Sequence, residues 1–284
     1  MKNITTLFFT VLFSFSMLAE VSLTDKEILV KLYQSTNGSQ WTKKWDLSSP
    51  VATWYGVQLE NDKVVSINLA GNNLVGTIPN EITNLVSLQE LNLHENNLTG
   101  GIPSAIGNLK DLKKLDVSFN KLTGVIPASI CDLDNLQQME LYMNMISGQL
   151  PEQIGKLKQL EVLSLYNNDI AGQIPASLYE ISTLKTLLLS SNKLTGKLAD
   201  KVGNFKSLEN LSLFDNNLEG QVPFELEKLG NLKEMNISYN MFSGLVSRNL
   251  ATLDTLNMTM INDKGVAVLL DVTMDRNKAF ASGD

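Results

Sequence analysis

Residues 112–132 read LKKLDVSFNKLTGVIPASICD, and variants of this stretch recur every 24 residues along most of the 284-residue chain. The recurring unit can be written LxxLxxLxLxxNxLxGxIPxxIxx, where x varies between copies. Its glycine and its asparagine each recur in eight successive copies without a change of spacing. A fixed period of this length predicts a solenoid, in which each copy forms one coil that buries its apolar side chains against the neighbouring coils.

The LxL portion of each unit predicts a short strand, because its residues alternate between the inside and the outside of the coil. Strands of successive coils should then stack in parallel. Just after the strand the chain turns sharply and leaves backbone groups that no strand can pair. An asparagine side chain carries two donors and an acceptor, so it can satisfy such groups from coil to coil. We therefore predict a structural ladder of Asn72, Asn96, Asn120, Asn144, Asn168, Asn192, Asn216 and Asn240.

The unit resembles a leucine-rich repeat, and its LxGxIP portion is similar to the plant-type subclass; eight copies cover residues 64–246. The resemblance implies an α/β solenoid, a horseshoe or superhelix with short parallel strands and a second small sheet near the Thr-Gly positions. It also implies binding through the concave surface of the strands, called the strand face below. It names no ligand, because the repeat is a scaffold for variable positions.

A solenoid needs a cap at each end, because the terminal coils would otherwise expose their core. Residues 20–63 contain a helical pattern and three tryptophans, which resemble the N-terminal cap of extracellular leucine-rich repeat proteins. That cap usually carries a disulfide around its WxGV motif, but Ala52 and Leu59 occupy the flanking positions here, which favours a bacterial or other microbial relative. In residues 247–284, alternating apolar stretches around NDKG predict a β-hairpin cap, or else a sorting or anchoring tail.

Residues 1–19 are typical of a secretory signal peptide. Lys2 precedes an apolar run over residues 7–18, which is too short for a membrane span. No later segment reaches membrane length either. We therefore predict an exported protein, secreted or held at the cell surface, without a membrane span.

The composition argues against most enzymatic and nucleic-acid-binding functions. With 23 basic and 30 acidic residues the formal net charge is −7, which disfavours nucleic acid as a partner. One cysteine and one histidine exclude a disulfide framework and most metal sites built from these residues. No GxSxG, HExxH, P-loop or dinucleotide-binding motif is present. The sequence predicts a non-enzymatic protein with no cofactor and no metal.

Two outward columns of the strand face hold more aromatic and apolar side chains than a solvated sheet needs. We interpret them as a recognition surface for an extracellular protein, peptide or glycan, although stacked neighbours could simply stabilise the sheet. Together with two nearby acids, the candidate binding residues are His94, Glu95, Asp116, Phe119, Glu140, Tyr142, Met143, Tyr166, Phe214, Asp215 and Tyr239.

Three alternative functions remain open at this point. Asp116 and Glu140 share one column in adjacent coils, about 5 Å apart, a spacing similar to the carboxylate pair of retaining glycosidases. The chain could therefore be a carbohydrate-active enzyme, although a solvated acidic surface or a weak Ca²⁺ site explains the same acids. A structural or adhesive surface protein is the second alternative. Ice binding is the third, because a hydroxyl column runs through Thr99, Thr123, Ser147, Thr195 and Ser243.

Overall fold

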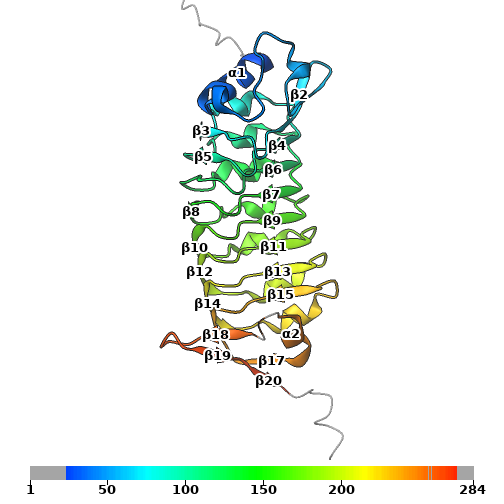
Figure 1. Ribbon diagram of the computed structural model, residues 1–284. Coiled ribbons are helices and arrows are strands. Elements are labelled where there is room, and N and C mark those ends of the chain that lie inside the picture. Colours follow the sequence, from blue (N-terminus) through cyan, green and yellow to red (C-terminus); the bar gives the residue numbers. More distant parts are fainter. Residues whose placement is uncertain (1–23, 255, 257, 274–284) are drawn as a thin grey trace, which may run out of the picture.

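The computed structural model describes residues 24–254, 256 and 258–273, which form a single stack of coils (Figure 1). The predicted signal peptide lies outside the described residues, as do residues 274–284 of the predicted C-terminal cap. The fold is an α/β solenoid, as the sequence predicts. Within the described part of the chain, no helix is long and apolar enough to cross a membrane.

The main sheet runs along one side of the stack and takes one parallel strand from each of the eight coils (Figure 1). One further strand, β1, is antiparallel and belongs to the N-terminal end. The order in space follows the order in sequence: β1 (Val57–Glu60), β2 (Lys63–Asn68), β4 (Glu90–Asn92), β6 (Lys114–Asp116), β7 (Gln138–Glu140), β9 (Val162–Ser164), β11 (Thr186–Leu188), β13 (Asn210–Ser212) and β15 (Glu234–Asn236).

A second, smaller sheet lies beside the Thr-Gly positions, as the resemblance implies. It is parallel and contains β8 (Ser147–Gly148), β10 (Asp169–Gln173), β12 (Lys193–Lys197), β14 (Asn217–Gln221) and β16 (Met241–Ser243). In the first coils β3 (Val75–Thr77) pairs with β5 (Asn97–Thr99). Each coil then crosses to the far side of the stack.

The far side is formed by short 3-10 helices, one in each coil from η3 to η9. Each lies about half a period after its main-sheet strand, so it faces away from the strand face. Their bounds are η3 (Asn80–Asn84), η4 (Ile106–Asn108), η5 (Ala128–Asp132), η6 (Ile154–Lys156), η7 (Ala176–Glu180), η8 (Asp200–Asn204) and η9 (Phe224–Lys228).

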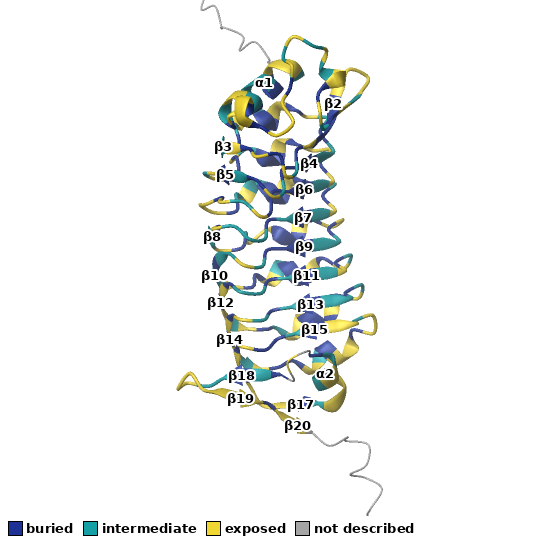
Figure 2. Cartoon of the chain, viewed as in Figure 1, coloured by how far each residue is buried: buried dark blue, intermediate teal, exposed yellow. Residues whose placement is uncertain are grey.

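The interior of the stack is one continuous apolar core, drawn dark blue along its whole length in Figure 2. The column of second LxL residues is buried in every coil from Leu93 to Ile237. Because each coil shares this core with its neighbours, stability is cooperative between coils rather than a property of one repeat.

The eight asparagines connect the coils through buried backbone groups. The Asn192 amide nitrogen donates to the carbonyls of Leu165, Leu189 and Ser190 at 3.0–3.1 Å. Its side-chain oxygen accepts the backbone N–H of Ile170 at 3.0 Å. From Asn96 to Asn240 each side chain reaches the coil before its own, whereas Asn72 exchanges hydrogen bonds with the backbone of Lys43 at the N-terminal end.

The N-terminal end is closed by a helix, a strand hairpin and tryptophans. Helix α1 (Asp25–Ser35) starts with a capping box, in which the Thr24 hydroxyl and the Glu27 carboxylate each accept the other residue's backbone N–H. Behind it, the ring of Trp45 stacks on that of Trp54 with centroids 4.8 Å apart. Two short 3-10 helices complete this region, η1 (Gly38–Gln40) and η2 (Val51–Thr53).

The C-terminal end contains the predicted hairpin and an unpredicted helix. The hairpin joins β18 (Thr259–Ile261) and β19 (Ala267–Leu269) in antiparallel register. The chain then leaves it, since β20 (Asp271–Thr273) pairs in parallel with β17 (Leu245–Ser247). The stretch predicted as a single strand of the hairpin therefore contains two strands, β19 and β20, which belong to two different sheets. Helix α2 (Arg248–Leu253) follows β17.

A buried aspartate closes the open edge of the last coil. Asp254 accepts the backbone N–H of Ile237 at 2.8 Å and the Ser238 hydroxyl at 2.9 Å. It also accepts the N–H of Met258 at 3.1 Å. These contacts replace the partners that a ninth coil would supply, and they bury Ser238, which the sequence places in an exposed column.

Candidate functional site

Three oxygen-bearing side chains lie side by side on the strand face. Asp116 in β6 is the register partner of Glu140 in β7, and Glu140 is the partner of Ser164 in β9. Side chains at matching positions of neighbouring strands point the same way, so these three residues form one column. Asp116 and Glu140 therefore share one column, as the sequence predicts. The side chains of this column are more deeply buried than we expected.

Asp116 and Ser118 are more deeply buried than strand alternation predicts. Asp116 is only 7% exposed, and its Oδ1 accepts both the backbone N–H and the hydroxyl of Ser118. Ser118 is fully buried, because His94 lies over it with Nδ1 2.8 Å from the serine oxygen. Since the serine proton goes to Asp116, the oxygen accepts from His94, which places a proton on Nδ1.

This arrangement is not that of a Ser-His-Asp triad. In a triad the histidine lies between the other two residues and takes the serine proton. Here Ser118 lies between His94 and Asp116, and its hydroxyl is buried and donates to the carboxylate. The three residues form a rigid polar network beneath the strand face.

Glu140 is a half-buried carboxylate to which the structure gives no hydrogen bond or ion pair among the described residues. Burial raises its pKa above the ordinary value, and the adjacent charge of Asp116 raises it further. Lys114 and His94 act in the opposite direction, but Lys114 Nζ lies 3.9 Å from Glu90 and His94 is bonded to Ser118. The ionised form of Glu140 is thus disfavoured in the folded state.

We expect Glu140→Gln to stabilise the protein at pH 7. The folded state holds the Glu140 proton more tightly than the unfolded chain, so ionisation of this group costs stability above its raised pKa. That cost disappears as the pH falls below the unfolded-state pKa. A like charge directly opposite in a sheet costs about 0.2–1 kcal/mol, which sets the size of the expected gain.

Urea unfolding at pH 7 and at pH 3.5 tests this expectation. The midpoint should rise in the variant at pH 7 and match the wild type at pH 3.5. Glu219→Gln is the matched control, because it makes the same change in an exposed side chain of β14. A gain of equal size at both pH values would contradict the account of Glu140.

Two tyrosines stack beside this column. Tyr142 and Tyr166 follow Glu140 and Ser164 by two residues, and their rings stack with centroids 4.5 Å apart and planes 10° apart. The His94 ring lies 6.0 Å from Tyr142 and 6.1 Å from Phe119. These four residues, His94, Phe119, Tyr142 and Tyr166, are called the aromatic cluster below.

The predicted stripe of aromatic side chains is therefore divided. Phe214 joins Tyr239, with ring centroids 5.2 Å apart, and no ring contact links Phe214 to Tyr166 in the described structure. Ser190 lies between them and hydrogen-bonds through its hydroxyl to Ser212. The pair of Phe214 and Tyr239 is smaller than the group around Tyr142 and Tyr166. No column of carboxylates like that of Asp116 and Glu140 lies beside it in the described structure.

The second predicted column lies at the rim of the strand face. Its residues precede the ladder asparagines and adopt left-handed backbone conformations, with φ between 50° and 59°: Glu95, Phe119, Met143, Asn167, Ser191, Asp215 and Tyr239. Such a conformation is costly for residues other than glycine. It turns these side chains out of the strand direction, which simple alternation does not predict. Phe119 is 44% exposed as a result.

The structure adds one apolar residue that the sequence analysis missed. A hollow of about 350 Å³ lies beside the aromatic cluster, and Phe119, Met143 and Met145 contribute to its lining. Met145 is 47% exposed. It follows a ladder asparagine, and Asn97 and Lys121 hold this position in the two preceding coils. The sequence could have indicated Met145, because it is apolar at a position where the two preceding coils carry polar residues.

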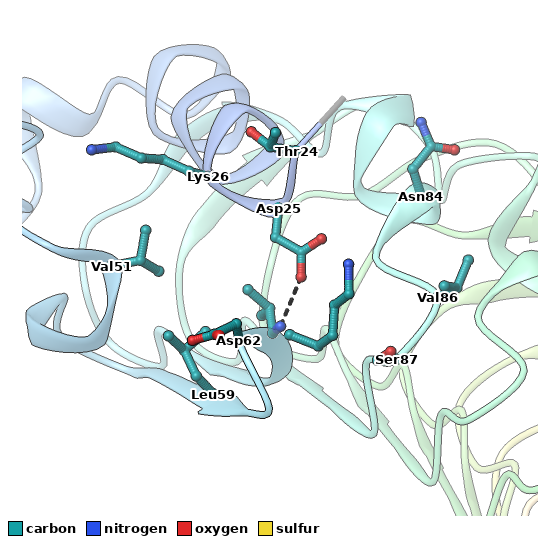
Figure 3. Close-up of a pocket in the computed structure, with 11 residues that line it drawn as sticks. Thr24, Asp25, Lys26, Val51, Leu59, Asp62, Asn84, Val86 and Ser87 are labelled. Atoms are coloured by element: carbon teal, nitrogen blue, oxygen red, sulfur yellow. Dashed lines mark hydrogen bonds between the residues drawn. The ribbon is translucent and has the colours of Figure 1, made fainter. Parts of the chain in front are cut away.

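A second hollow, of about 710 Å³, lies at the N-terminal end. Figure 3 shows Asp25 pointing into it, and its carboxylate accepts the backbone N–H of Val64 at 2.8 Å. Lys26 and Asp62 also line the hollow. The Asp25 hydrogen bond links helix α1 to the first coil. We therefore interpret this hollow as part of the contact between the N-terminal cap and the first coil, and not as a ligand site. No cluster of three or more metal-binding side chains occurs in the described part of the chain.

Family models match the chain along most of the stack. A model described as a leucine-rich repeat region matches residues 141–262, and two leucine-rich repeat models match residues 88–146 and 63–85. These ranges coincide with the coils. This chain is a leucine-rich repeat protein.

Among curated relatives of this leucine-rich repeat protein is a probable leucine-rich repeat receptor-like protein kinase of Arabidopsis thaliana. It is 37% identical over 78 residues, which are 22% of this chain and 8% of the kinase. The sequence prediction of a microbial relative thus gains no support, because the matched organism is a plant.

Two solved structures are similar to this leucine-rich repeat protein over most of its length. One is described as a plant peptide hormone receptor, RGFR1, in complex with RGF2; it is 30% identical with a TM-score of 0.64, covering 73% of this chain and 32% of that chain. The other, PEPR1 with AtPEP1, is 27% identical with a TM-score of 0.71, covering 87% and 41%. This chain therefore spans less than half the length of these two proteins.

Proposed function

We propose that this leucine-rich repeat protein is a non-enzymatic recognition module that binds an extended peptide, or an extended segment of a protein, on its strand face. The observation that carries the proposal is the aromatic cluster beside Glu140, a partly exposed aromatic surface next to a carboxylate that has no hydrogen-bond partner among the described residues. Aromatic anchors supply large contact area at little entropic cost. The similarity to a peptide hormone receptor supports the same class of ligand.

Export and surface exposure belong to this proposal. A recognition module of this kind acts outside the cell, and the signal peptide predicted in residues 1–19 would deliver it there. A microbial origin stays a prediction that rests on the missing cap disulfide. Nucleic acid is not the proposed partner, since the chain is acidic.

The alternative of a carbohydrate-active enzyme is weaker. A retaining glycosidase needs both carboxylates at the substrate. Asp116 is buried and hydrogen-bonded to Ser118, so only Glu140 faces a ligand. Ice binding requires a regular hydroxyl surface, and Ala171 and Glu219 interrupt the column.

Selection of random linear peptides on the purified protein tests the proposal. We expect enriched peptides that bind saturably and that slow hydrogen exchange in β6, β7 and β9. Failure to enrich any peptide above the bare matrix would count against it. Protection confined to the 3-10 helices or the caps would move the site elsewhere, and saturable binding of an oligosaccharide alone would change the class of ligand.

A further inference from the structure

The acid column on the strand face has too few hydrogen-bond donors for its oxygen atoms. Asp116 receives its two hydrogen bonds from Ser118 on one oxygen, Oδ1. Glu140 receives none from the described residues. Lys114, which lies near Glu90, faces the column, as does His94, which is bonded to Ser118 and has Nδ1 3.9 Å from Asp116 Oδ1. Both favour the ionised form of Glu140, but neither forms a hydrogen bond or an ion pair with it in the described structure.

Ser164 is an independent unsatisfied polar group in the same column. It is only 3% exposed, and its hydroxyl has no hydrogen-bond partner among the described residues. A buried hydroxyl without a partner is uncommon and costs stability. Ser164 is the register partner of Glu140, so its oxygen is one strand spacing, about 4.8 Å, along the same column. Asp116 Oδ2, the Glu140 carboxylate and the Ser164 hydroxyl thus have hydrogen-bonding capacity that the described residues leave unused.

The neighbouring side chains favour a flat cation. Tyr142 and Tyr166 stand two residues beyond Glu140 and Ser164, just after the ends of β7 and β9, so the tyrosine pair borders the column. A guanidinium group is planar, carries five N–H donors and packs against aromatic faces. An ammonium ion is compact and lacks the planar surface for such packing.

We propose that the strand face holds a subsite for an arginine side chain of the bound peptide, with the guanidinium paired to Glu140 and packed against the Tyr142–Tyr166 stack. Asp116 acts as the second, more deeply placed negative charge that strengthens the attraction. This inference rests on the proposed function, because it names one residue of the peptide partner.

Titration with N-acetyl-arginine amide tests the subsite without a known partner. Backbone amide signals of ¹⁵N-labelled full-length protein should shift saturably in β6, β7 and β9, with a dissociation constant on the order of 1 mM. N-acetyl-citrulline amide has the same shape without the charge, and it should bind at least about tenfold more weakly.

Glu140→Gln should weaken binding of the arginine probe by about tenfold and leave citrulline binding unchanged, while Glu219→Gln should alter neither. Equal binding of the two probes, an unaffected Glu140→Gln variant, or no saturable shift in the three strands would overturn the subsite.

The two proposals can fail separately. Selected peptides that bind the strand face without arginine, and equally well to Glu140→Gln, would leave the recognition function standing and overturn the subsite. Arginine binding at Glu140 without any selected peptide would support the subsite and contradict peptide recognition.

Discussion

Asn192→Ala should lower the free energy of unfolding by about 1–3 kcal/mol, because it leaves buried backbone groups without partners. The side chain donates to three carbonyls and accepts one N–H, and these groups belong to two successive coils. The affected N–H and carbonyls are inside the stack, so water cannot replace the lost bonds at no cost. Since coils are stabilised by their neighbours, the loss should lower the midpoint of the whole transition.

Asn204→Ala provides the matched control for this prediction. Asn204 ends helix η8 on the far side of the stack, and its side chain is exposed. The same atoms are removed, yet the free energy of unfolding measured in urea should change by less than about 0.5 kcal/mol. Equal effects of the two substitutions would mean that the ladder contributes nothing specific.

The repeated unit made the stack of coils predictable from sequence. Its period fixes the parallel strands, and its asparagines match backbone groups that every coil leaves unpaired. The C-terminal cap was predictable only in part, since nothing periodic indicates that β20 leaves the hairpin to pair with β17.

Burial on the strand face was the part that sequence could not supply. Alternation gives the direction of a side chain but not what covers it. Ser118 points outward and is buried because His94 crosses over it, and Ser238 is buried because Asp254 closes the last coil. Both contacts join residues whose proximity depends on side-chain conformation or on the cap.

Only some of the contacts within the candidate site could be predicted from the sequence. Tyr142 and Tyr166 occupy adjacent coils, so their stacking follows from the period. The rim position of Phe119 depends on a left-handed backbone that the repeat imposes and that no residue preference signals. That no described residue forms a hydrogen bond or ion pair with Glu140 depends on the positions of the surrounding side chains, which the sequence does not give.

Tyr142→Ala combined with Tyr166→Ala should weaken binding of a selected peptide by about tenfold or more. Truncating an aromatic anchor at the centre of an interface typically costs about 2 kcal/mol or more. The rings point out of the coil, so their loss opens no cavity in the core. The cost to folding should be limited to the stack itself, about 0.5–1.5 kcal/mol for such a pair.

Phe224→Ala is the control for the double substitution. Phe224 starts η9 on the far side of the stack and is an exposed aromatic residue. Its truncation should leave peptide affinity unchanged within about twofold.

The most direct test of recognition through the strand face is to measure the dissociation constant of one selected peptide by calorimetry, for the wild type and for the double variant. Both proteins must be folded under the conditions used. The quantity of interest is the constant of the variant divided by that of the wild type. The account predicts a ratio of about ten or more, with Phe224→Ala near one. A double variant that binds as tightly as the wild type while unfolding far more easily would contradict it, because the tyrosines would then serve only the sheet.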